Sequence, residues 1–592
     1  MTPQDKQAPY FVNFIDRKPP DLTHLSSRAR HFWHMAAGVT IGLGLWYLSW
    51  RWTASLNHEA MLFSVSVATA ETMAFLGTLL FFFNIWDEGD TVAGPLPLSR
   101  SDVGLVGPGD IRVSVFITTY DEDVDLVRYS VEAALKLEVP EHVALNIYVA
   151  DDGNRPEMHA MTQSVGVGYF KRGNNRGYKA GNLANALFQT ETDFFVICDA
   201  DTQVFPQFLE RTLGYFRDTK VAFVQTPHWF YDIPEGQDHE DWLEEKIGRP
   251  ARILAPALRM ISGRQKMGTD PFLSRSDMFF DVIQRRRNRH NASFCCGAGS
   301  IHRTEAIFGN ALEEQGQALM RAQKNSKSKT SFLPMLDMQL FKYHVSEDIF
   351  TALQQHSKGW RSVYHPEVLA RMLSPWSMNA WATQKLKYAG GTFDIMLRSN
   401  LIWRRGLPWQ TRLHYMATFW SYLAVLWMPI LFLAPMISLL TGLAPVDAYS
   451  IEFFLHLIPL LLANELAMSI GCKGHDIHTG RTLSLATLNI QLRALGHVLR
   501  GQKPHFPTTS KNPAISDSVR YAIPALCVLA IMAVIAVYGI FAYYAGWETH
   551  SASLVVVNLF WMGLNAIAFG RVALAAFWLP RLPNGRLLQF AP

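Results

Sequence analysis

The segment DFFVICDADTQVFP, from Asp193 to Pro206, places two aspartates directly after a short apolar run. Phe194–Cys198 has the length and the continuous apolarity of a buried strand. In open α/β sheets, ligands bind at the carboxyl ends of the strands, which is where Asp199 and Asp201 fall. Such a pair can bind a divalent cation that takes its other ligands from substrate phosphates. Because Asp-x-Asp also occurs in ordinary turns, the flanking segments must decide between the two interpretations.

Two further predicted strands also end in acidic or hydroxyl side chains. Ile111–Thr118 alternates like a strand and ends in TTYDED at 118–123, and Ala144–Ala150 is a second strand that ends in Asp151 and Asp152. A helical pattern lies between them, so the order predicts a parallel sheet with right-handed crossovers. Capping and turn formation explain any one such strand end, but they explain three in succession poorly.

A basic, Gly- and Asn-rich stretch, KRGNNRGYKAGNLANAL at 171–187, lies between the second and third strands. We expect a helix to begin near Asn182, and backbone amides at its start, with Arg172, Arg176 and Lys179, can hold phosphate. No GxxxxGK[ST] loop occurs in the 592 residues, which argues against an ATP-driven transporter.

Six apolar runs are long enough for the roughly 20 residues that a membrane helix needs. They are Phe32–Trp52, Met61–Trp86, His414–Leu443, Ile451–Gly471, Tyr521–Gly546 and Ala552–Trp578. The interval between the second and third runs is polar and rich in strand-like segments. The chain is therefore predicted to be two helices, a soluble domain and four helices.

Charge and cysteine content limit location and partners. Lys and Arg are concentrated before the first span, in the large domain, in the 472–518 loop and in the tail, so the positive-inside rule predicts cytoplasmic termini and a cytoplasmic domain. The net charge of +4 does not suggest a nucleic-acid partner. The five cysteines are odd in number and scattered, so we expect reduced thiols and no zinc site.

Two segments suit the membrane interface. In the first, Trp403 and Trp409 lie among arginines, which predicts an interfacial helix over 396–412. In the second, leucines recur on one face of an amphipathic helix predicted over 481–500. The Pro-interrupted stretch that follows, within 501–515, is predicted to be an exposed loop.

Seven motifs, in chain order, resemble those of the cellulose-synthase-type processive enzymes of glycosyltransferase family 2. The motifs are YVADDG, KAGNLANAL, ICDADT, FVQTPHWFYD, NASFCCGAGSIHR, VSEDIFTAL and GWRSVY, and the resemblance recurs in FPTTSK at 506–511. It implies an α/β nucleotide-diphospho-sugar transferase (GT-A) domain inserted between two and four transmembrane helices. The implied domains are a cytoplasmic N-terminus (1–31), two spans (32–95), the GT-A domain (96–395), the interfacial helix (396–412) and four spans (413–592).

The resemblance also implies roles for individual residues. Asp348 resembles the general base that deprotonates the acceptor, beside Glu347, although the first turn of a helix also favours acids for electrostatic reasons. Asp199 and Asp201 resemble the pair that binds Mg²⁺ or Mn²⁺. The implied nucleotide-sugar residues are Thr119, Tyr120, Glu122, Asp151, Asp152, Lys179, Asp199, Gln384 and Lys387. The implied acceptor residues are Cys296, Gly297, Trp360 and Tyr388, and Phe506, Thr509 and Lys511 match a gating loop over the nucleotide.

One motif departs from the family pattern. The family's QxxRW helix is present as Gln384-Lys385-Leu386-Lys387-Tyr388, so Lys387 and Tyr388 replace an arginine and a tryptophan. Lys meets a phosphate only as a point charge, without the two-pronged geometry of Arg, whereas Tyr still offers a face for a sugar ring.

The activity implied is processive, inverting transfer of a hexose, preferably from UDP-glucose, to a growing β-glucan that leaves through the enzyme's own helices. The altered motif favours a curdlan-like β-1,3-glucan or a mixed β-1,3/1,4-glucan, with cellulose as the alternative. A non-processive transferase onto a lipid phosphate, and a transporter that senses nucleotide, stay open. The implied setting is a bacterial inner membrane, with the lipids and the glucan chain as partners and accessory secretion subunits as an open question.

Overall fold

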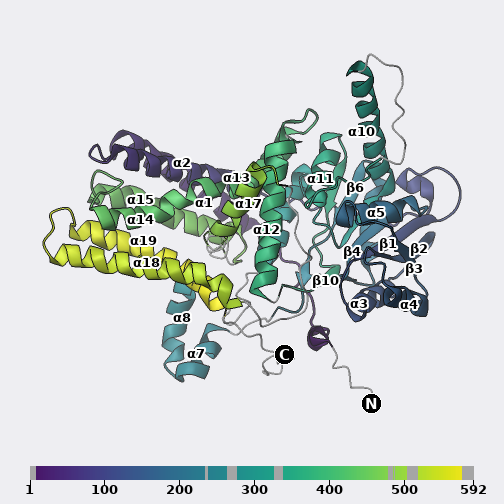
Figure 1. Ribbon diagram of the computed structural model, residues 1–592, viewed down its shortest axis with the longest axis horizontal. Coiled ribbons are helices and arrows are strands. Elements are labelled where there is room, and N and C mark those ends of the chain that lie inside the picture. The colour runs from purple at the N-terminus through teal and green to yellow at the C-terminus, as the bar shows by residue number, and fades with distance from the viewer. Residues whose placement is uncertain are drawn as a thin grey trace.

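The computed structural model describes residues 9–233, 238–262, 276–325, 338–375, 377–399, 401–475, 477, 485, 487–502 and 518–576. Figure 1 shows a group of long helices on one side of the molecule and an α/β domain on the other, joined in the middle by helices α12 (Met378–Asp394) and α17 (Leu488–Leu499). The α/β domain is formed by residues between the second and third apolar runs, as the sequence predicts.

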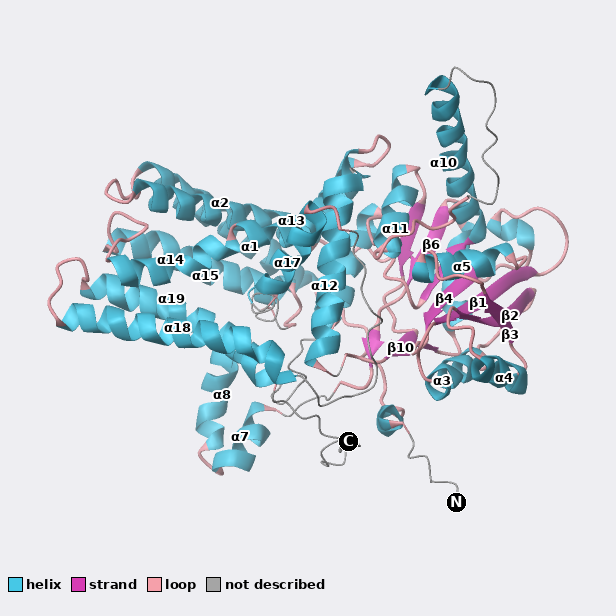
Figure 2. Cartoon of the chain, in the orientation of Figure 1, coloured by secondary structure: helices cyan, strands magenta, loops and turns pink. Residues whose placement is uncertain are grey.

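A seven-stranded sheet forms the centre of the α/β domain (Figure 2). Its order is β3-β2-β1-β4-β8-β6-β9, with bounds Gly168–Lys171, Val143–Asp151, Ile111–Thr119, Phe194–Asp199, Ser300–Arg303, Val221–Gln225 and Arg361–Tyr364. The parallel pairing of β1 with β2 and β4 confirms the predicted parallel sheet. β8 runs antiparallel to both β4 and β6, which the local pattern did not indicate.

Alternating side chains of the strands pack against helices on both faces of this sheet. Odd-numbered residues of β1 such as Val113 and Val115 pack with α3 (Val124–Ala134) and α4 (Pro156–Val165). Phe116, on the opposite face, packs with α5 (Tyr178–Phe188) and with the first turns of α10 (Thr304–Asn325). Successive strand residues point to opposite faces, so both faces of β1 are covered, and Val113, Val115 and Phe116 are all buried.

A smaller sheet has the order β5-β10-β7, formed by Gln203–Val204, Ala370–Met372 and Trp229–Phe230. The 3₁₀-helix η1 (Tyr10–Phe14) packs against it: Phe11 and Phe14 are buried with Trp229 and Leu373. The hydroxyl of Tyr10 donates to Asp232 Oδ2 at 3.0 Å. Residues 10–14 therefore pack against the α/β domain.

Five helical stretches among the described residues are long and apolar enough to cross a membrane. They are Met61–Asn84, Trp409–Thr441, Ile451–Gly471, Ala522–Tyr544 and Ala552–Ala575, and they contain α2, α13 with α14, α15, most of α18 and α19. The remaining predicted span forms helix α1 (Ser27–Thr53), which packs on α2 and α15 but is less apolar. Its crossing of the membrane therefore stays a prediction.

One predicted segment has a different structure, and two others lie partly outside the described residues. Residues 396–412 are not one helix. A short π-helix (Ile395–Ser399) and a 3₁₀-helix (Leu401–Trp403) come first, followed by Gly406, whose φ is +95°, and by Pro408. Helix α13 begins only at Trp409. Of 481–500, the structure describes α17 and the residues next to it. Only Gly501 and Gln502 of the 501–515 loop are described, so Phe506, Thr509 and Lys511 lie outside the described residues.

Candidate functional site

The register of the central sheet brings the three acidic strand ends together, as predicted. Thr119 at the end of β1 pairs with Asp151 at the end of β2, and Thr118 pairs with Asp199 at the end of β4. Helix α5 begins at Tyr178, four residues before the predicted start, so Lys179 lies in its first turn. Lys179 Nζ donates to Asp199 Oδ1 at 2.5 Å. One basic side chain therefore crosses from the Gly-rich stretch to the predicted metal pair.

Asp151 is buried and its oxygens are occupied by the protein itself. Oδ1 accepts the Gly153 N–H at 2.9 Å, and Oδ2 accepts the Arg155 N–H at 2.9 Å and the Tyr169 hydroxyl at 3.1 Å. Since these donors use the lone pairs of the carboxylate, Asp151 shapes the turn that follows β2. Its role in binding the nucleotide sugar stays a prediction.

Asp152, next in the chain, forms a two-pronged ion pair with Arg172, at 2.5 and 2.6 Å. Burial raises the pKa of Asp152 despite the opposing effect of Arg172. A cavity of about 560 Å³ opens beside it, lined by Tyr120, Asp121, Glu122, Asp123, Val124, Asp152, Gly153, Arg155 and Glu157. Three predicted nucleotide-sugar residues therefore line one open cavity.

Arg155, which the sequence reasoning missed, lines this cavity and donates hydrogen bonds to neighbouring residues. Arg155 Nη2 donates to Thr119 Oγ1 at 2.8 Å, and Nη1 donates to the backbone carbonyl of Glu122. Glu122 Oε2 accepts both the Thr119 hydroxyl and the Tyr120 N–H, each at 2.8 Å. Arg155 is the single basic residue of DDGNRPE, a signal that could have marked it as the counter-charge of this acidic segment.

The two residues of the predicted metal pair differ in exposure. The Asp199 side chain is 46% exposed, whereas Asp201 is buried and its Oδ2 accepts the Leu373 N–H at 3.0 Å. No cluster of three or more His, Cys, Asp or Glu residues suited to a metal occurs within the described part of the chain. A protein that offers one or two carboxylates fits a hard cation whose remaining ligands are water and substrate phosphates. The donor set therefore fits Mg²⁺ or Mn²⁺ bound together with a diphosphate.

Glu347 and Asp348 lie in the first turn of α11 (Glu347–Ser357). Burial and the neighbouring carboxylate raise the pKa of Glu347 to about 7, and burial also raises the pKa of Asp348. Lys179 opposes both shifts. Its own pKa is raised although burial lowers it, because the charges of Asp199 and Glu347 outweigh the burial. Lys179 is thus the shared counter-charge of the metal pair and the predicted base.

The backbone of Gly297 comes close to this shared charge. Its φ is +91°, and a Cβ added there would lie 3.4 Å from Lys179 Nζ and 3.9 Å from Asp348 Oδ2. A side chain at this position would fill the space between the two charged groups, so Gly keeps it open. The adjacent Cys296 is held by its N–H, which donates to Gln225 Oε1 at 2.7 Å. Gln225 was also missed by the sequence reasoning.

Helix α12 brings two more predicted residues to the site. The charge of Lys387 opposes the rise in the pKa of Glu347 and of Asp348 that burial causes. Tyr388 is 46% exposed, and its pKa is raised by burial and then by the charge of Asp348. Gln384 lies one turn earlier on the same helix, half-buried.

Trp360, the remaining predicted acceptor residue, packs against the same buried cluster as Cys296. It follows the C-terminal end of α11, whereas Asp348 lies in the first turn, and a helix of this length spans roughly 16 Å. Trp360 packs against the buried cluster that contains Phe294 and Tyr415. The role of Trp360 in binding the acceptor stays a prediction.

Two family models match the sequence: Glycosyl transferase family 2 over residues 114–307 and Glycosyl transferase family group 2 over residues 265–468. Cellulose synthase 2 of Novacetimonas hansenii is 28% identical over 68% of this chain and 22% of that protein. The UDP-forming cellulose synthase catalytic subunit of Xanthomonas axonopodis pv. citri is 28% identical over 64% of this chain and 45% of that protein. The chain spans less than half the length of these two curated relatives.

Among solved structures, the mannosyltransferase PcManGT from Pyrobaculum calidifontis, in complex with GDP-Man and Mn²⁺, is 13% identical, with a TM-score of 0.46. The match covers 74% of this chain and all of that one. The two matched family models and the similarity to cellulose synthases support the assignment of this chain to the cellulose-synthase-like members of glycosyltransferase family 2, and the mixed sheet and the five apolar helices support a GT-A domain with transmembrane helices.

Proposed function

We propose that the protein transfers a hexose from a UDP-sugar to a growing β-glucan, processively and with inversion, and passes the polymer through its own membrane helices. The observation that carries this proposal is the position of Lys179 between Asp199 and the Glu347–Asp348 pair. Because one side chain serves as counter-charge to both sites, the residues that would bind the leaving diphosphate lie close to the base that would act on the acceptor hydroxyl. The similarity to cellulose synthases supports a glucan as the product.

In this proposal the donor nucleotide occupies the cavity beside Asp152 and Tyr120. Arg155 lines the cavity and fixes Thr119 by a hydrogen bond. Lys179 exchanges its bond to Asp199 for one to the diphosphate of the donor. A divalent cation held by Asp199 and Asp201 would neutralise charge that develops on the departing UDP.

Asp348 supplies the base. Its carboxylate takes the proton of the acceptor hydroxyl, whose oxygen bonds to the anomeric carbon as the bond to the diphosphate breaks. A positioned base of this kind contributes about 10² to 10⁴-fold. Gly297 leaves room for the acceptor beside Asp348, and Tyr388 offers a ring on which the terminal sugar can stack, because pyranose faces are apolar and their edges polar.

The linkage rests on the altered helix motif. Lys387 and Tyr388 stand where the family has Arg and Trp, which favours a curdlan-like β-1,3-glucan or a mixed β-1,3/1,4-glucan. Cellulose is the second candidate, favoured by the names of the relatives. We further propose UDP-glucose as the donor, the bacterial inner membrane as the location, and a cytoplasmic catalytic domain, which the distribution of Lys and Arg supports.

The test uses purified full-length protein in lipid nanodiscs, given one UDP-sugar at a time with Mg²⁺ or Mn²⁺. We expect UDP release and an insoluble polymer with UDP-glucose, and digestion with linkage-specific glucanases then assigns the linkage. Digestion by a β-1,4-glucanase alone would identify cellulose. The absence of UDP release with every sugar nucleotide would contradict the proposed function.

A further inference from the structure

Three consecutive arginines, Arg285, Arg286 and Arg287, are almost completely buried. They form the short helix α9, which continues from the π-helix η4 (Met278–Gln284) at the boundary between the catalytic domain and the membrane helices. Burying a guanidinium is costly unless it is paired and hydrogen-bonded. The partners of these three side chains therefore indicate why they are there.

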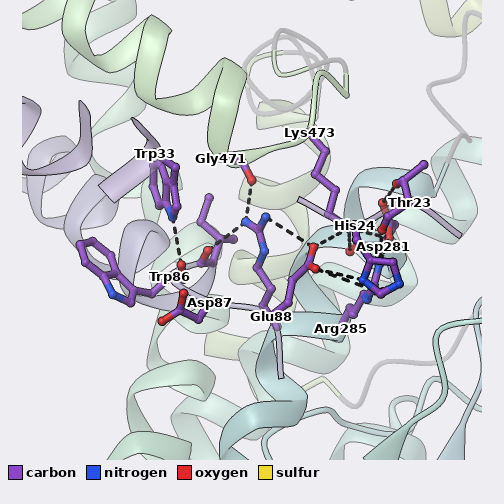
Figure 3. Close-up of polar contacts among 12 residues, drawn as sticks. Thr23, His24, Trp33, Trp86, Asp87, Glu88, Asp281, Arg285, Gly471 and Lys473 are labelled. Carbon is purple, nitrogen blue, oxygen red and sulfur yellow. Dashed lines mark hydrogen bonds and ion pairs between the residues drawn. The ribbon is translucent and has the colours of Figure 1, made fainter. Parts of the chain in front are cut away.

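Arg285 is held by an acidic residue of another segment and by one of the preceding helix turn. It pairs with Asp90, after the end of α2, at 2.7 Å and with Asp281, one turn earlier in η4, at 3.0 Å (Figure 3). It also donates to the backbone carbonyl of Thr23, which precedes α1, at 2.6 Å. Lys473, after α15, joins the same group through Glu88 at 2.7 Å and Asp281 at 3.0 Å.

Arg286 binds the ends of two membrane helices. Its Nη1 donates to the carbonyl of Ile85 at the end of α2, at 2.9 Å, and to the carbonyl of Gly471 at the end of α15, at 2.5 Å. The last carbonyls of a helix have no partner within the helix and carry partial negative charge. A single guanidinium thus caps both helices from the catalytic side.

Arg287 reaches a third helix. Its Nε donates to Asn84 Oδ1 in α2 at 2.9 Å, and its Nη2 donates to the carbonyl of His414 and to Thr418 Oγ1, both in α13, at 3.0 and 2.6 Å. Together, Arg286 and Arg287 contact α2, α13 and α15 near the helix ends that are predicted to face the cytoplasm.

The residue just before the arginines contacts the acceptor side of the site. Gln284 Nε2 donates to the carbonyl of Phe294 at 2.9 Å and to Cys296 Sγ at 3.0 Å. The Ser293 hydroxyl donates to the Gln284 carbonyl at 2.6 Å. Cys296 precedes Gly297, whose backbone lies beside Lys179 and Asp348.

We call Gln284–Arg287 the arginine joint and Ser293–Gly297 the acceptor loop. We propose that the arginine joint positions the acceptor loop relative to the membrane helices, so that the end of the growing polysaccharide is directed into the membrane. The inference rests on the proposed function and deepens it. The four residues are positioning residues: they act through the loop and the helices and do not touch the reacting atoms. Loosening the joint is expected to separate sugar transfer from elongation.

The main variant is Arg287→Met, which removes the bonds to α2 and α13 but keeps an apolar stem. We expect polymer synthesis to fall by about 100-fold, since small misplacements of a reacting group can cost that much. UDP affinity and slow hydrolysis of the UDP-sugar are expected to stay unchanged, so that more UDP is released per sugar incorporated. Arg287→Lys, which keeps a donor, should restore part of the elongation. Arg361→Met, which removes a surface ion pair with Asp218, is the matched control.

A purely structural role predicts a different pattern. In that case Arg287→Met lowers UDP binding, hydrolysis and elongation together, and this outcome overturns the proposal, as does normal elongation. Should Arg287→Met fail to fold, Gln284→Met decides, because it removes only the contacts to the loop and must give the same separation of transfer from elongation.

A second readout does not depend on activity. Spin labels on exposed Val106 in the catalytic domain and Ile451 in α15, with exposed Cys527 replaced by Ser, report the distance between the two bodies. Arg287→Met is expected to broaden the distance distribution and Arg361→Met to leave it unchanged. An unchanged distribution in Arg287→Met contradicts the joint, whereas a wild-type protein that makes no polymer contradicts the proposed function instead.

Discussion

Replacing Asp348 with Asn removes one of two neighbouring half-buried carboxylates, and it is expected to stabilise the protein while abolishing polymer synthesis. The pKa of Glu347 rises from its ordinary 4.5 to about 7. The difference, 7 − 4.5 = 2.5, corresponds to roughly 3 kcal/mol at 1.36 kcal/mol for each pKa unit. Burial causes the larger part and remains in the variant, so we expect a gain of about 1 kcal/mol from relieving the repulsion of Asp348.

The sign of the pH dependence follows from the raised pKa. A carboxyl whose pKa is raised in the folded state contributes stability below its unfolded pKa, and this contribution is lost as the pH rises through the folded pKa. The advantage of Asp348→Asn should therefore be largest at about pH 8 and shrink toward pH 5. Thermal unfolding in detergent at both pH values measures it, with Asp218→Asn, in a half-exposed surface ion pair, as the control.

The same variant tests catalysis. UDP binding, measured by calorimetry, should persist because a base acts on the acceptor, whereas polymer formation should fall by about 10² to 10⁴-fold. Equal destabilisation at both pH values would refute the repulsion argument. Loss of UDP binding together with polymer formation would refute the role of Asp348 as base.

Three further predictions concern the same site. Asp199→Ala should weaken UDP binding when Mn²⁺ is present and change it little after chelation; equal weakening in both conditions would indicate misfolding. Lys179→Met should tighten the binding of Mn²⁺ alone, because the ammonium group that bonds to Asp199 Oδ1 is gone, and an unchanged affinity in a metal titration would show that the two do not compete. Tyr388→Ala should shorten the polymer while UDP affinity is kept, and Tyr388→Trp should retain elongation; polymer of normal length from a stable Tyr388→Ala protein would exclude a stacking role.

The strands that carry the site could be predicted from the sequence because their signals are local. β1, β2 and β4 are strand patterns of six to nine residues that end in hydroxyl or acidic side chains, and parallel pairing gathers those ends. The proximity of Thr119, Asp151 and Asp199 follows from that pairing alone. Lys179 was predicted as a phosphate ligand, but its bond to Asp199 depends on where α5 begins.

The parts that were missed depend on contacts between distant segments. β5 and β7 have two residues each, too few for any periodic pattern, and η1 reaches the small sheet across more than 200 residues of sequence. The arginine joint shows no periodic pattern either. Its partners lie in or next to α2, α13 and α15, which are distant in the sequence, so these contacts could not be predicted from local patterns.

The central claim is processive polymer synthesis, and the length of the product at low turnover tests it most directly. Purified protein in nanodiscs receives labelled UDP-glucose, and the products are sized when fewer sugars have been transferred than would give each enzyme molecule a long chain. The account predicts long chains from a minority of the enzyme molecules, with little material of intermediate length. Products that carry a single added sugar, or chains that lengthen uniformly with time on a lipid acceptor, would contradict it.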